Sequence, residues 1–450
     1  MAEVNRSQKE AVGGGTARTG DVTEPWTPAD YAGDPGLQGP GTVDGSGVGA
    51  AGLRTFDSFK NPQFRLYWFA MMGQMGAMNM QMMARTWYAY DLSGSATMLG
   101  VMALALALPM LLFSLYGGII ADRAQKRYVL LIGQAASGVL ALGIAISISI
   151  GAISIGHLIV AGVFQGTIMG LMMPSRQAII PESVGEKGLM NAISLNAAGM
   201  NINRLMAPAV AGFLIDGIGI KGVYYAMTGL YLIAVGFIIA LRPTTSTSVN
   251  TGRAWDDLKE GVSYIRGNTT ILGLLLLTLL MVLLSVPFQF LLPIFTEDIL
   301  DVGARGLGVL FSVSGVGALV GSLVIASLGN RNRGRLFLLS GLVLSVMLIA
   351  FSISTWYPLS LLIILPIGLA NSGRMTLSLT LVQSFTDDAH RGRVMSIYMM
   401  EFGLMSISTF GVSIVSEFIG IQWAIGGTAG ILLVITLYYL AFVPGMRRLQ

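Results

Sequence analysis

The chain has 450 residues, of which 54% are hydrophobic and 11% are charged, and that charged share is roughly half of what a soluble protein carries. Its apolar residues fall into separate runs of about 20 to 28 residues, the length that membrane-spanning helices require. The sequence contains no cysteine and two histidines, which excludes disulfides and metal centres built from these ligands, so we expect no metal and no cofactor.

The apolar runs indicate an all-α membrane protein. A run of about 20 residues, at about 1.5 Å per residue, spans the roughly 30 Å hydrocarbon layer. Backbone amide groups find no water partner inside lipid, so each run must form a helix. The runs therefore predict about twelve transmembrane helices.

The first segment, residues 1–52, is rich in glycine, threonine, aspartate and proline and contains no hydrophobic signal-peptide region. We expect it to be a disordered cytoplasmic tail, with a regulatory or partner-binding role as the alternative. Residues 53–242 form an N-terminal half, in which we expect helices at 65–90, 96–121, 128–149, 154–174, 189–217 and 222–242.

A cytoplasmic linker at residues 243–268 leads to a C-terminal half at residues 269–450. In the linker, Trp255, Val262 and Ile265 share one helical face, which predicts an amphipathic helix lying along the membrane surface. A plain connector is the alternative. In the C-terminal half we expect helices at 269–295, 305–329, 334–354, 357–384, 391–419 and 423–444.

Basic residues concentrate in alternate loops. These loops contain Arg123, Lys126, Arg127, Arg176, Lys187, Arg242, Arg253, Lys259, Arg266, Arg331, Arg333, Arg335, Arg391, Arg393, Arg447 and Arg448. The intervening loops contain Lys221 and Arg305. The positive-inside rule therefore predicts a multi-pass protein of the inner cell membrane with both termini in the cytoplasm. The basic pI follows from this topology, and we expect no nucleic-acid partner.

Two similar stretches occupy corresponding places in the two halves. "DGIGIKG" begins at Asp216 and "EFIGIQW" begins at Glu417, and each places an acidic residue three positions before Gly-Ile at the outer end of a long helix. Parallel six-helix repeats are a known plan of transporters. The repetition therefore favours two six-helix halves.

Several motifs carry a resemblance to a known family. "GGIIADRAQKR" follows the second expected helix, "NPQFRLYW" begins at Asn61, and "RGRVMSIY" begins at Arg391. With these motifs the chain, over about residues 55–445, resembles the major facilitator superfamily, and within it the drug- and siderophore-efflux branch of macrolide-efflux and enterobactin-exporter-like proteins. The resemblance implies a transporter whose halves surround a central cavity.

The loop motif matches the superfamily pattern at Gly118, Asp122, Arg123 and Arg127, with Gln125 in place of the second glycine. The resemblance implies a gating latch, in which Asp122 pairs with an arginine and lies near the N-terminus of the eleventh helix, where partial positive charge favours a carboxylate. We expect Gly118 to let the second helix approach a neighbour closely. A positive-inside anchor without a gating role is the alternative.

"APAVAG" in the fifth helix resembles the antiporter motif Gly-Pro-x-x-Gly-Gly, with Ala207 and Ala211 at two glycine positions. Pro208 removes a backbone donor and bends the helix, and small residues such as Gly212 let it pack tightly on the opposite half. Family members with this motif are mostly proton-driven exporters, which the resemblance implies here. An ordinary kinked membrane helix is the alternative.

The charged residues Arg85, Arg204, Arg374 and Glu401 fall inside expected helices. A charge inside the membrane costs several kcal/mol, so each is a candidate for substrate binding or coupling. Arg374 and Glu401 both lie about 15 Å from the cytoplasmic ends of neighbouring helices, near mid-membrane. We expect Glu401 to carry a coupling proton, with a purely structural Glu401–Arg374 pair as the alternative. Arg204 lacks a deep acid in its own half, so either it faces a water-filled cavity or it is neutralised by Glu401 or by an anionic substrate. For Arg85, snorkelling is the alternative.

Polar side chains accompany these charges. The fold analogy implies that amides on the first, fourth, seventh and tenth helices line the central cavity, and the fifth helix carries a polar stripe of its own. The candidates are Asn79, Gln165, Asn203, Gln289 and Asn371. The abundant methionines of the first helix suit an adaptable apolar pocket, with lipid-facing filler as the alternative.

These observations predict a secondary active transporter that exports an amphiphilic organic solute, such as a drug, siderophore or metabolite, by alternating access with proton coupling. We expect it to act as a monomer whose partners are the solute, protons and membrane lipid. A lysophospholipid flippase is one alternative, and a non-transporting membrane sensor or scaffold is another. The sequence lacks a G-x-x-x-x-G-K-[ST] phosphate loop and a nucleophile–base set, so we expect neither an ATP-driven pump nor an enzyme.

Overall fold

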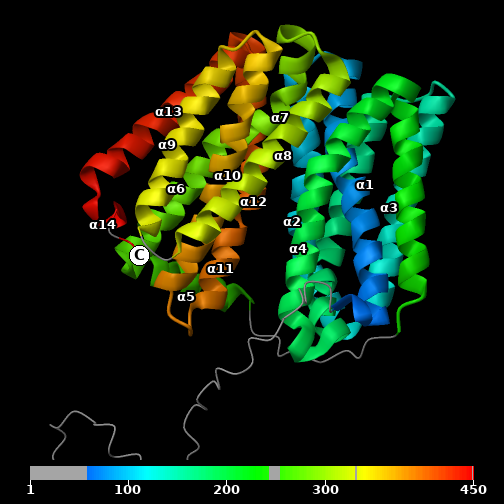
Figure 1. The fold of residues 1–450 in the computed structure, drawn as a ribbon, viewed down its shortest axis with the longest axis horizontal. Helices are drawn as coiled ribbons and strands as arrows, with labels where there is room; N and C mark the ends of the chain where they lie inside the picture. The colour runs from blue at the N-terminus through cyan, green and yellow to red at the C-terminus, as the bar shows by residue number, and fades with distance from the viewer. Residues whose placement is uncertain (1–57, 243–253, 330–331, 448, 450) are drawn as a thin grey trace, which may run out of the picture. The chain divides into compact units, whose positions relative to one another are not determined.

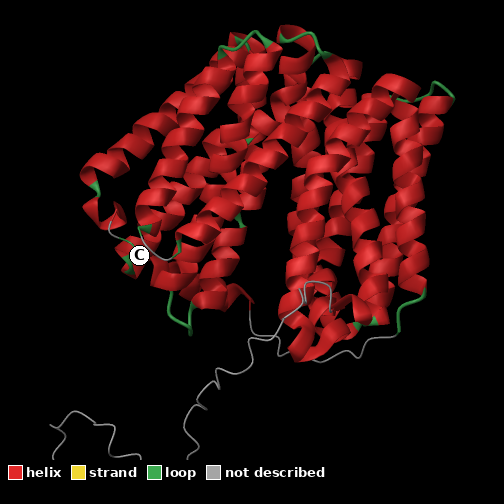
Figure 2. Cartoon of the chain, in the orientation of Figure 1, coloured by secondary structure: helices red, strands yellow, loops and turns green. Residues whose placement is uncertain are grey.

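The computed structural model describes residues 58–242, 254–329, 332–447 and 449. The expected tail at residues 1–52 lies outside this part of the chain, as does the beginning of the linker. The described residues form helices and no strand (Figure 2). An all-α protein is therefore confirmed.

The first group of helices contains α1 (Pro62–Ser93), α2 (Ala96–Arg123), α3 (Lys126–Ser149) and α4 (Ile155–Ile239). The start of α1 is fixed by local chemistry: the Asn61 side chain accepts a hydrogen bond from the Gln63 amide, and Pro62 occupies the first helical position. Its end is fixed by Gly94, whose φ of 59° is the left-handed conformation that glycine adopts readily.

The single label α4 covers a stretch that reverses direction twice. It begins just after the end of α3, and its Arg176 carbonyl accepts a hydrogen bond from Tyr67 near the start of α1. Further along, the Tyr225 hydroxyl lies 3.1 Å from Ser149 at the end of α3, whereas Ile239 accepts a bond from Arg127 at the start of α3. One reversal coincides with Gly219, whose φ is 78°. The three helices expected at 154–174, 189–217 and 222–242 are therefore three passes of α4.

The linker and the second group follow in chain order. Their helices are α5 (Ala254–Gly267), α6 (Thr269–Ser285), α7 (Pro287–Ile294), a π-helical turn (Phe295–Ile299), α8 (Gly303–Leu328), α9 (Arg333–Ser352), α10 (Tyr357–Phe385), α11 (Arg391–Met399), α12 (Glu401–Ile419), α13 (Ile421–Phe442) and α14 (Pro444–Arg447). Two expected helices are each divided: the one at 269–295 breaks at Val286, and the one at 391–419 breaks at Met400.

The described residues contain ten segments that are long and apolar enough to cross a membrane. One of them, Met190–Ile239, has 50 residues, about 75 Å of helix. This length exceeds the roughly 30 Å layer, and the reversal at Gly219 divides it into two crossings. α1 is not among the ten, yet it runs the length of the group from Tyr67 to Tyr90. Counting α1 and the second crossing of Met190–Ile239 with the ten segments brings the number of crossings in the described residues to the expected twelve.

The two ends of the helix bundle differ in charge. We call one the arginine-rich end, where Arg127, Arg176 and Arg242 lie, and the other the acidic end, where Glu297 and Asp298 lie. In Figure 1, α1–α4 stand beside α6–α13, and the two groups approach each other at the acidic end, drawn uppermost.

Candidate functional site

Arg374 is the most deeply placed cation of the second group. It lies within α10 with 6% of its surface exposed. Its Nε and Nη2 donate to Asn371 Oδ1 at 3.3 and 3.1 Å, whereas its Nη1 is buried without a hydrogen-bond partner. The guanidinium is therefore held by one neutral acceptor of its own helix and keeps a free donor.

Glu401 lies beside Arg374, at the point where α11 ends and α12 begins. The two side chains interact electrostatically, but in the described part of the chain they do not form an ion pair. Tyr398, one helical turn before Glu401, is 5% exposed, and its hydroxyl lies 2.9 Å from that of Ser378 on α10. Glu401 is half-buried, so this carboxyl group is neither locked to a cation nor freely solvated.

Arg204 comes from the first group, is exposed, and interacts electrostatically with Arg374 of the second. The neighbouring Leu205 carbonyl accepts a 2.6 Å hydrogen bond from Ser312 of α8, which fixes this level of α4 against the second group. The arrangement brings two arginines and one glutamate together between the groups, with a net positive charge. Together with Asn371 and Tyr398 we call these residues the central polar cluster.

The segment that resembles the antiporter motif packs against α8, as its small residues predict. A methyl group added at Gly212 would lie 2.7 Å from the Ala304 carbonyl oxygen, and one at Gly308 would lie 2.6 Å from the Pro208 carbonyl oxygen. Ala207 and Ala211 are both buried. The close approach of the fifth expected helix to the opposite half is therefore confirmed; its link to proton antiport stays a prediction.

The loop motif requires one correction. Nothing lies within 4 Å of the position that a Cβ of Gly118 would occupy, whereas a Cβ at Gly117 would lie 2.3 Å from the Gly170 carbonyl oxygen of α4. The expectation that Gly118 allows close approach is therefore wrong, because the neighbouring residue faces α4. Arg127 donates to the Ile239 carbonyl oxygen. The side chains of Asp122 and Arg123 lie outside the described part, so the proposed latch stays a prediction.

Contacts that the sequence did not predict join the two groups at the acidic end. Trp87 Nε1 donates to Glu297 Oε1, and the Tyr90 hydroxyl donates to Asp298 Oδ2, each at 2.5 Å. A cavity of about 340 Å³ lies beside them, lined by Tyr90, Asp298 and Glu417 among others. In the sequence, only the acid pair Glu297–Asp298 at the end of a hydrophobic run indicates that polar contacts form here.

Glu417 and Asp216, singled out by their matching sequences, occupy matching positions. Glu417 Oε2 accepts from the backbone amide of Thr97 at 3.1 Å and from the hydroxyls of Ser95 and Thr97 at 3.1 and 3.3 Å, so it caps the start of α2 in the other group. Asp216 lies 3.9 Å from Arg305, in the first turn of α8 in the other group. Each acid thus lies at a helix N-terminus, where negative charge is favoured.

The remaining candidates lie within their own groups. Asn79 donates to the Met75 carbonyl oxygen at 2.8 Å, and Asn203 donates to the Gly199 carbonyl oxygen at 3.2 Å. Gln289 is half-buried in α7. Arg85 and Gln165 are 5% and 4% exposed, so snorkelling to the surface does not describe Arg85 here.

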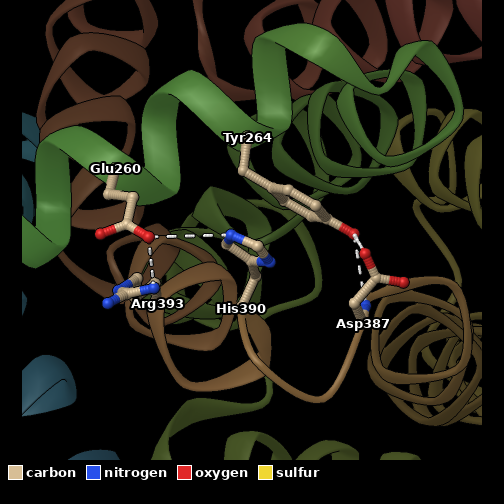
Figure 3. A network of polar contacts seen from close by, with 5 residues as sticks. All are labelled: Glu260, Tyr264, Asp387, His390 and Arg393. Carbon is tan, nitrogen blue, oxygen red and sulfur yellow. Dashed lines mark hydrogen bonds and ion pairs between the residues drawn. The ribbon is translucent and has the colours of Figure 1, made fainter.

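The expected linker helix is present as α5, and a polar network fastens it to the loop before α11 (Figure 3). Glu260 Oε1 lies 2.7 Å from Arg393 Nη1 and 3.8 Å from His390 Nε2. The Tyr264 ring stacks on the His390 ring at 4.1 Å, and its hydroxyl donates to Asp387 Oδ2 at 2.9 Å. The linker therefore belongs structurally to the second group at the arginine-rich end.

Comparisons with known proteins agree with this architecture. A family model described as "Transmembrane secretion effector" matches residues 53–449. The staphyloferrin A transporter of Staphylococcus aureus is 24% identical over 386 residues, covering 85% of this chain and 95% of that protein. The enterobactin exporter EntS of Escherichia coli O1:K1 is 23% identical over 286 residues, covering 63% of this chain and 68% of that protein.

Solved structures show the same fold at low sequence identity. The nucleoside transporter NupG is 13% identical, with a TM-score of 0.70 over 85% of this chain and 99% of that one. A bacterial homologue of the lysosomal transporter Spinster, described as inward-facing and unoccupied, is also 13% identical, with a TM-score of 0.66 over 89% and 98% of the two chains.

Proposed function

Because the chain belongs to the transmembrane secretion effector family of the major facilitator superfamily, and is thus a multi-pass membrane transporter, we propose that it exports an anionic, amphiphilic organic solute in exchange for protons. It works as a monomer and by alternating access. The observation that carries the proposal is the central polar cluster, where Arg374 interacts with the carboxyl group of Glu401 and with Arg204 of the opposite group.

The charge balance of this cluster supports an anionic solute. Two cations against one carboxylate leave a net positive charge between the groups. Arg204 is exposed, but Arg374 is buried, and a buried charge costs several kcal/mol unless it is paired. The free Nη1 of Arg374 provides a donor for a carboxylate or catecholate oxygen. The two relatives named for siderophores make a siderophore-like acid the first solute to test.

Glu401 is the proposed proton carrier. The anionic solute occupies the cluster while Glu401 is deprotonated. Protonation from the outside after solute release removes the attraction of Glu401 for Arg374 and favours return of the empty transporter to the cytoplasm-facing state. Because the two side chains are close without forming an ion pair, small movements at the α11–α12 break suffice to change this balance. Proton and solute thus occupy the cluster at opposite stages of the cycle, as antiport requires.

The basic loops support the orientation in which both termini and the arginine-rich end face the cytoplasm. In that orientation, the contacts of Glu417, Trp87 and Tyr90 close the transporter toward the outside. The structure then corresponds to the state that takes up solute from the cytoplasm. Loss of these contacts accompanies release outside.

The test is transport in proteoliposomes with an imposed pH gradient, using a panel of siderophore-like acids, neutral drugs and lysophospholipids. We expect gradient-driven transport of an acid. Glu401→Gln abolishes stimulation by the gradient but retains downhill flux, whereas Arg374→Gln raises KM for the acid about tenfold, the effect of about 1.4 kcal/mol.

Arg335→Gln is the matched control, because this exposed arginine lies at the start of α9, away from the cluster. Unchanged gradient stimulation in Glu401→Gln contradicts the coupling role. Transport of lysophospholipid alone contradicts the proposed solute and favours a flippase.

A further inference from the structure

Arg85 is a buried cation that the proposed transport cycle does not use. It lies within α1, 5% exposed, and both its Nε and its Nη1 lack a hydrogen-bond partner. Its Nη1 lies 3.7 Å from the position of a Cβ on Gly162 in α4, where the absence of a side chain leaves the guanidinium against the helix backbone. This arginine faces the interior of the first group of helices.

The ionisable groups that interact with Arg85 are the hydroxyls of Tyr224 and Tyr231, which are 1% and 2% exposed. No acidic residue of the described chain interacts with it. Both tyrosines belong to the last pass of α4. A tyrosine hydroxyl donates hydrogen bonds but carries no charge that could balance the guanidinium. The charge of Arg85 is therefore uncompensated by any acidic residue of the described part of the chain.

Further buried polar groups surround this position. Gln165, one helical turn beyond Gly162, donates to Ser137 Oγ of α3 at 3.3 Å, and its Oε1 has no partner. Gln134, one turn before Ser137 on α3, is fully buried, and neither of its amide atoms has a partner. Such unsatisfied groups destabilise the folded protein. They are rare in folded proteins unless a ligand or ordered water satisfies them.

Water satisfies hydrogen bonds but does not neutralise a charge, and a buried cation without a counter-ion is the costlier defect. We propose that Arg85, with Tyr224 and Tyr231, forms a binding site for a compact anionic group inside the first group of helices. The site takes chloride or a carboxylate group, because both offer a compact negative acceptor to guanidinium and hydroxyl donors. The unpartnered Gln165 Oε1 is itself an acceptor and takes ordered water. It is separate from the central polar cluster, which lies between the groups.

The test uses the purified full chain in detergent, with chloride, acetate or citrate replacing the bulky anion isethionate at constant ionic strength. We expect a saturable rise of ~2 °C or more in the midpoint of thermal unfolding, because a ligand of the folded state stabilises it by mass action. A response to chloride alone identifies an inorganic anion, and a response to acetate or citrate alone identifies the carboxylate of an organic acid.

Variants of Arg85, compared with one of an exposed arginine, make the assignment specific. Arg85→Gln removes the anion response, Arg85→Lys retains a weaker one, and Arg335→Gln retains the full one. If Arg85→Gln does not fold, a weakened anion response of Arg85→Lys still shows that the anion binds at Arg85. The proposal is overturned if the wild type shows no response, if the Arg85 variants respond as the wild type does, or if tyrosinate absorbance near neutral pH shows that Tyr224 or Tyr231 supplies the negative charge.

Discussion

Gly117 faces α4 so closely that an added methyl group would lie 2.3 Å from the Gly170 carbonyl oxygen and 3.0 Å from Leu171 Cα. At the next residue, Gly118, the same methyl group would meet nothing within 4 Å. Successive residues of a helix point about 100° apart. One of the two glycines therefore sets the distance between helices while the other faces open space.

This difference gives a prediction at two adjacent positions. Gly117→Ala lowers the free energy of unfolding by roughly 1–3 kcal/mol, because the clash is with backbone that cannot rotate away. Gly118→Ala changes it by less than about 0.5 kcal/mol. Thermal unfolding of the two variants in detergent measures the difference. Equal effects would show that the helices α2 and α4 are not packed as described.

Residues differ in how far the sequence reveals their role. Arg374 and Glu401 stood out because charge is rare in apolar runs, whatever the tertiary structure. The position within the motif favours Gly118. Which of the adjacent residues Gly117 and Gly118 faces a neighbouring helix depends on the rotation of α2 about its axis, and two identical residues give no indication of this rotation. Trp87 and Tyr90 were missed because an aromatic residue near a helix end is common in membrane proteins, and their partners are far away in the sequence.

At the scale of elements, the start of α2 is held by an acid from the other group. Glu417 accepts three hydrogen bonds from Ser95 and Thr97, one of them from a free backbone amide of the helix N-terminus. Such an interaction combines a charge-assisted hydrogen bond with the favourable helix dipole. Any state that opens the acidic end must break it.

We therefore expect Glu417→Ala to shift the transporter toward the state that is open at the acidic end. Because the sequence has no cysteine, a single Ile294→Cys substitution reports opening: this residue is 5% exposed and lines the cavity near Tyr90. The rate of thiol labelling rises roughly five- to tenfold, as expected for the loss of a contact of about 1–1.4 kcal/mol. Gln422→Ala, which alters the same cavity, is the control and leaves the rate nearly unchanged.

The contact between α5 and α11 gives a second prediction at this scale. Glu260 and Arg393 side chains are 52% and 29% exposed, so solvent screens their 2.7 Å contact. A double-mutant cycle with Glu260→Gln and Arg393→Gln is expected to yield a coupling of about 0.5 kcal/mol in unfolding free energy. The pair Asp388–Arg391, more exposed and within three residues, serves as the control and gives a smaller coupling. A coupling of zero at Glu260–Arg393 would mean that this ion pair does not hold α5, and that the contacts of Tyr264 with His390 and Asp387 do so instead.

Helix breaks illustrate what a pattern of apolar residues leaves undetermined. The break at Val286 precedes Pro287, which opens α7, and proline in a helix interior is a known cause of such breaks. The break at Met400 has no comparable residue, and hydrophobicity continues through it. The position of Glu401 at the start of α12 therefore could not be derived from the sequence.

For the whole molecule, the length and spacing of the apolar runs were sufficient to predict the crossings, because the bilayer fixes how long each must be. The pairing of the groups was predictable only in outline. Asp216 and Glu417 were recognised as equivalent, and each lies at a helix N-terminus of the opposite group. The contact of each acid with the opposite group is a result of three-dimensional packing and could not be read from the sequence.

Orientation in the membrane is the remaining property of the whole molecule, and two alanines test it. Ala152 is exposed between α3 and α4 at the acidic end, and Ala389 is exposed between α10 and α11 at the arginine-rich end. With single Ala152→Cys or Ala389→Cys substitutions in this cysteine-free chain, we expect a membrane-impermeant maleimide to label position 152 in intact cells and position 389 after permeabilisation. Basic loops resist translocation, which is the physical reason for this orientation. The reverse pattern would place the arginine-rich end outside and turn the proposed uptake state into a release state.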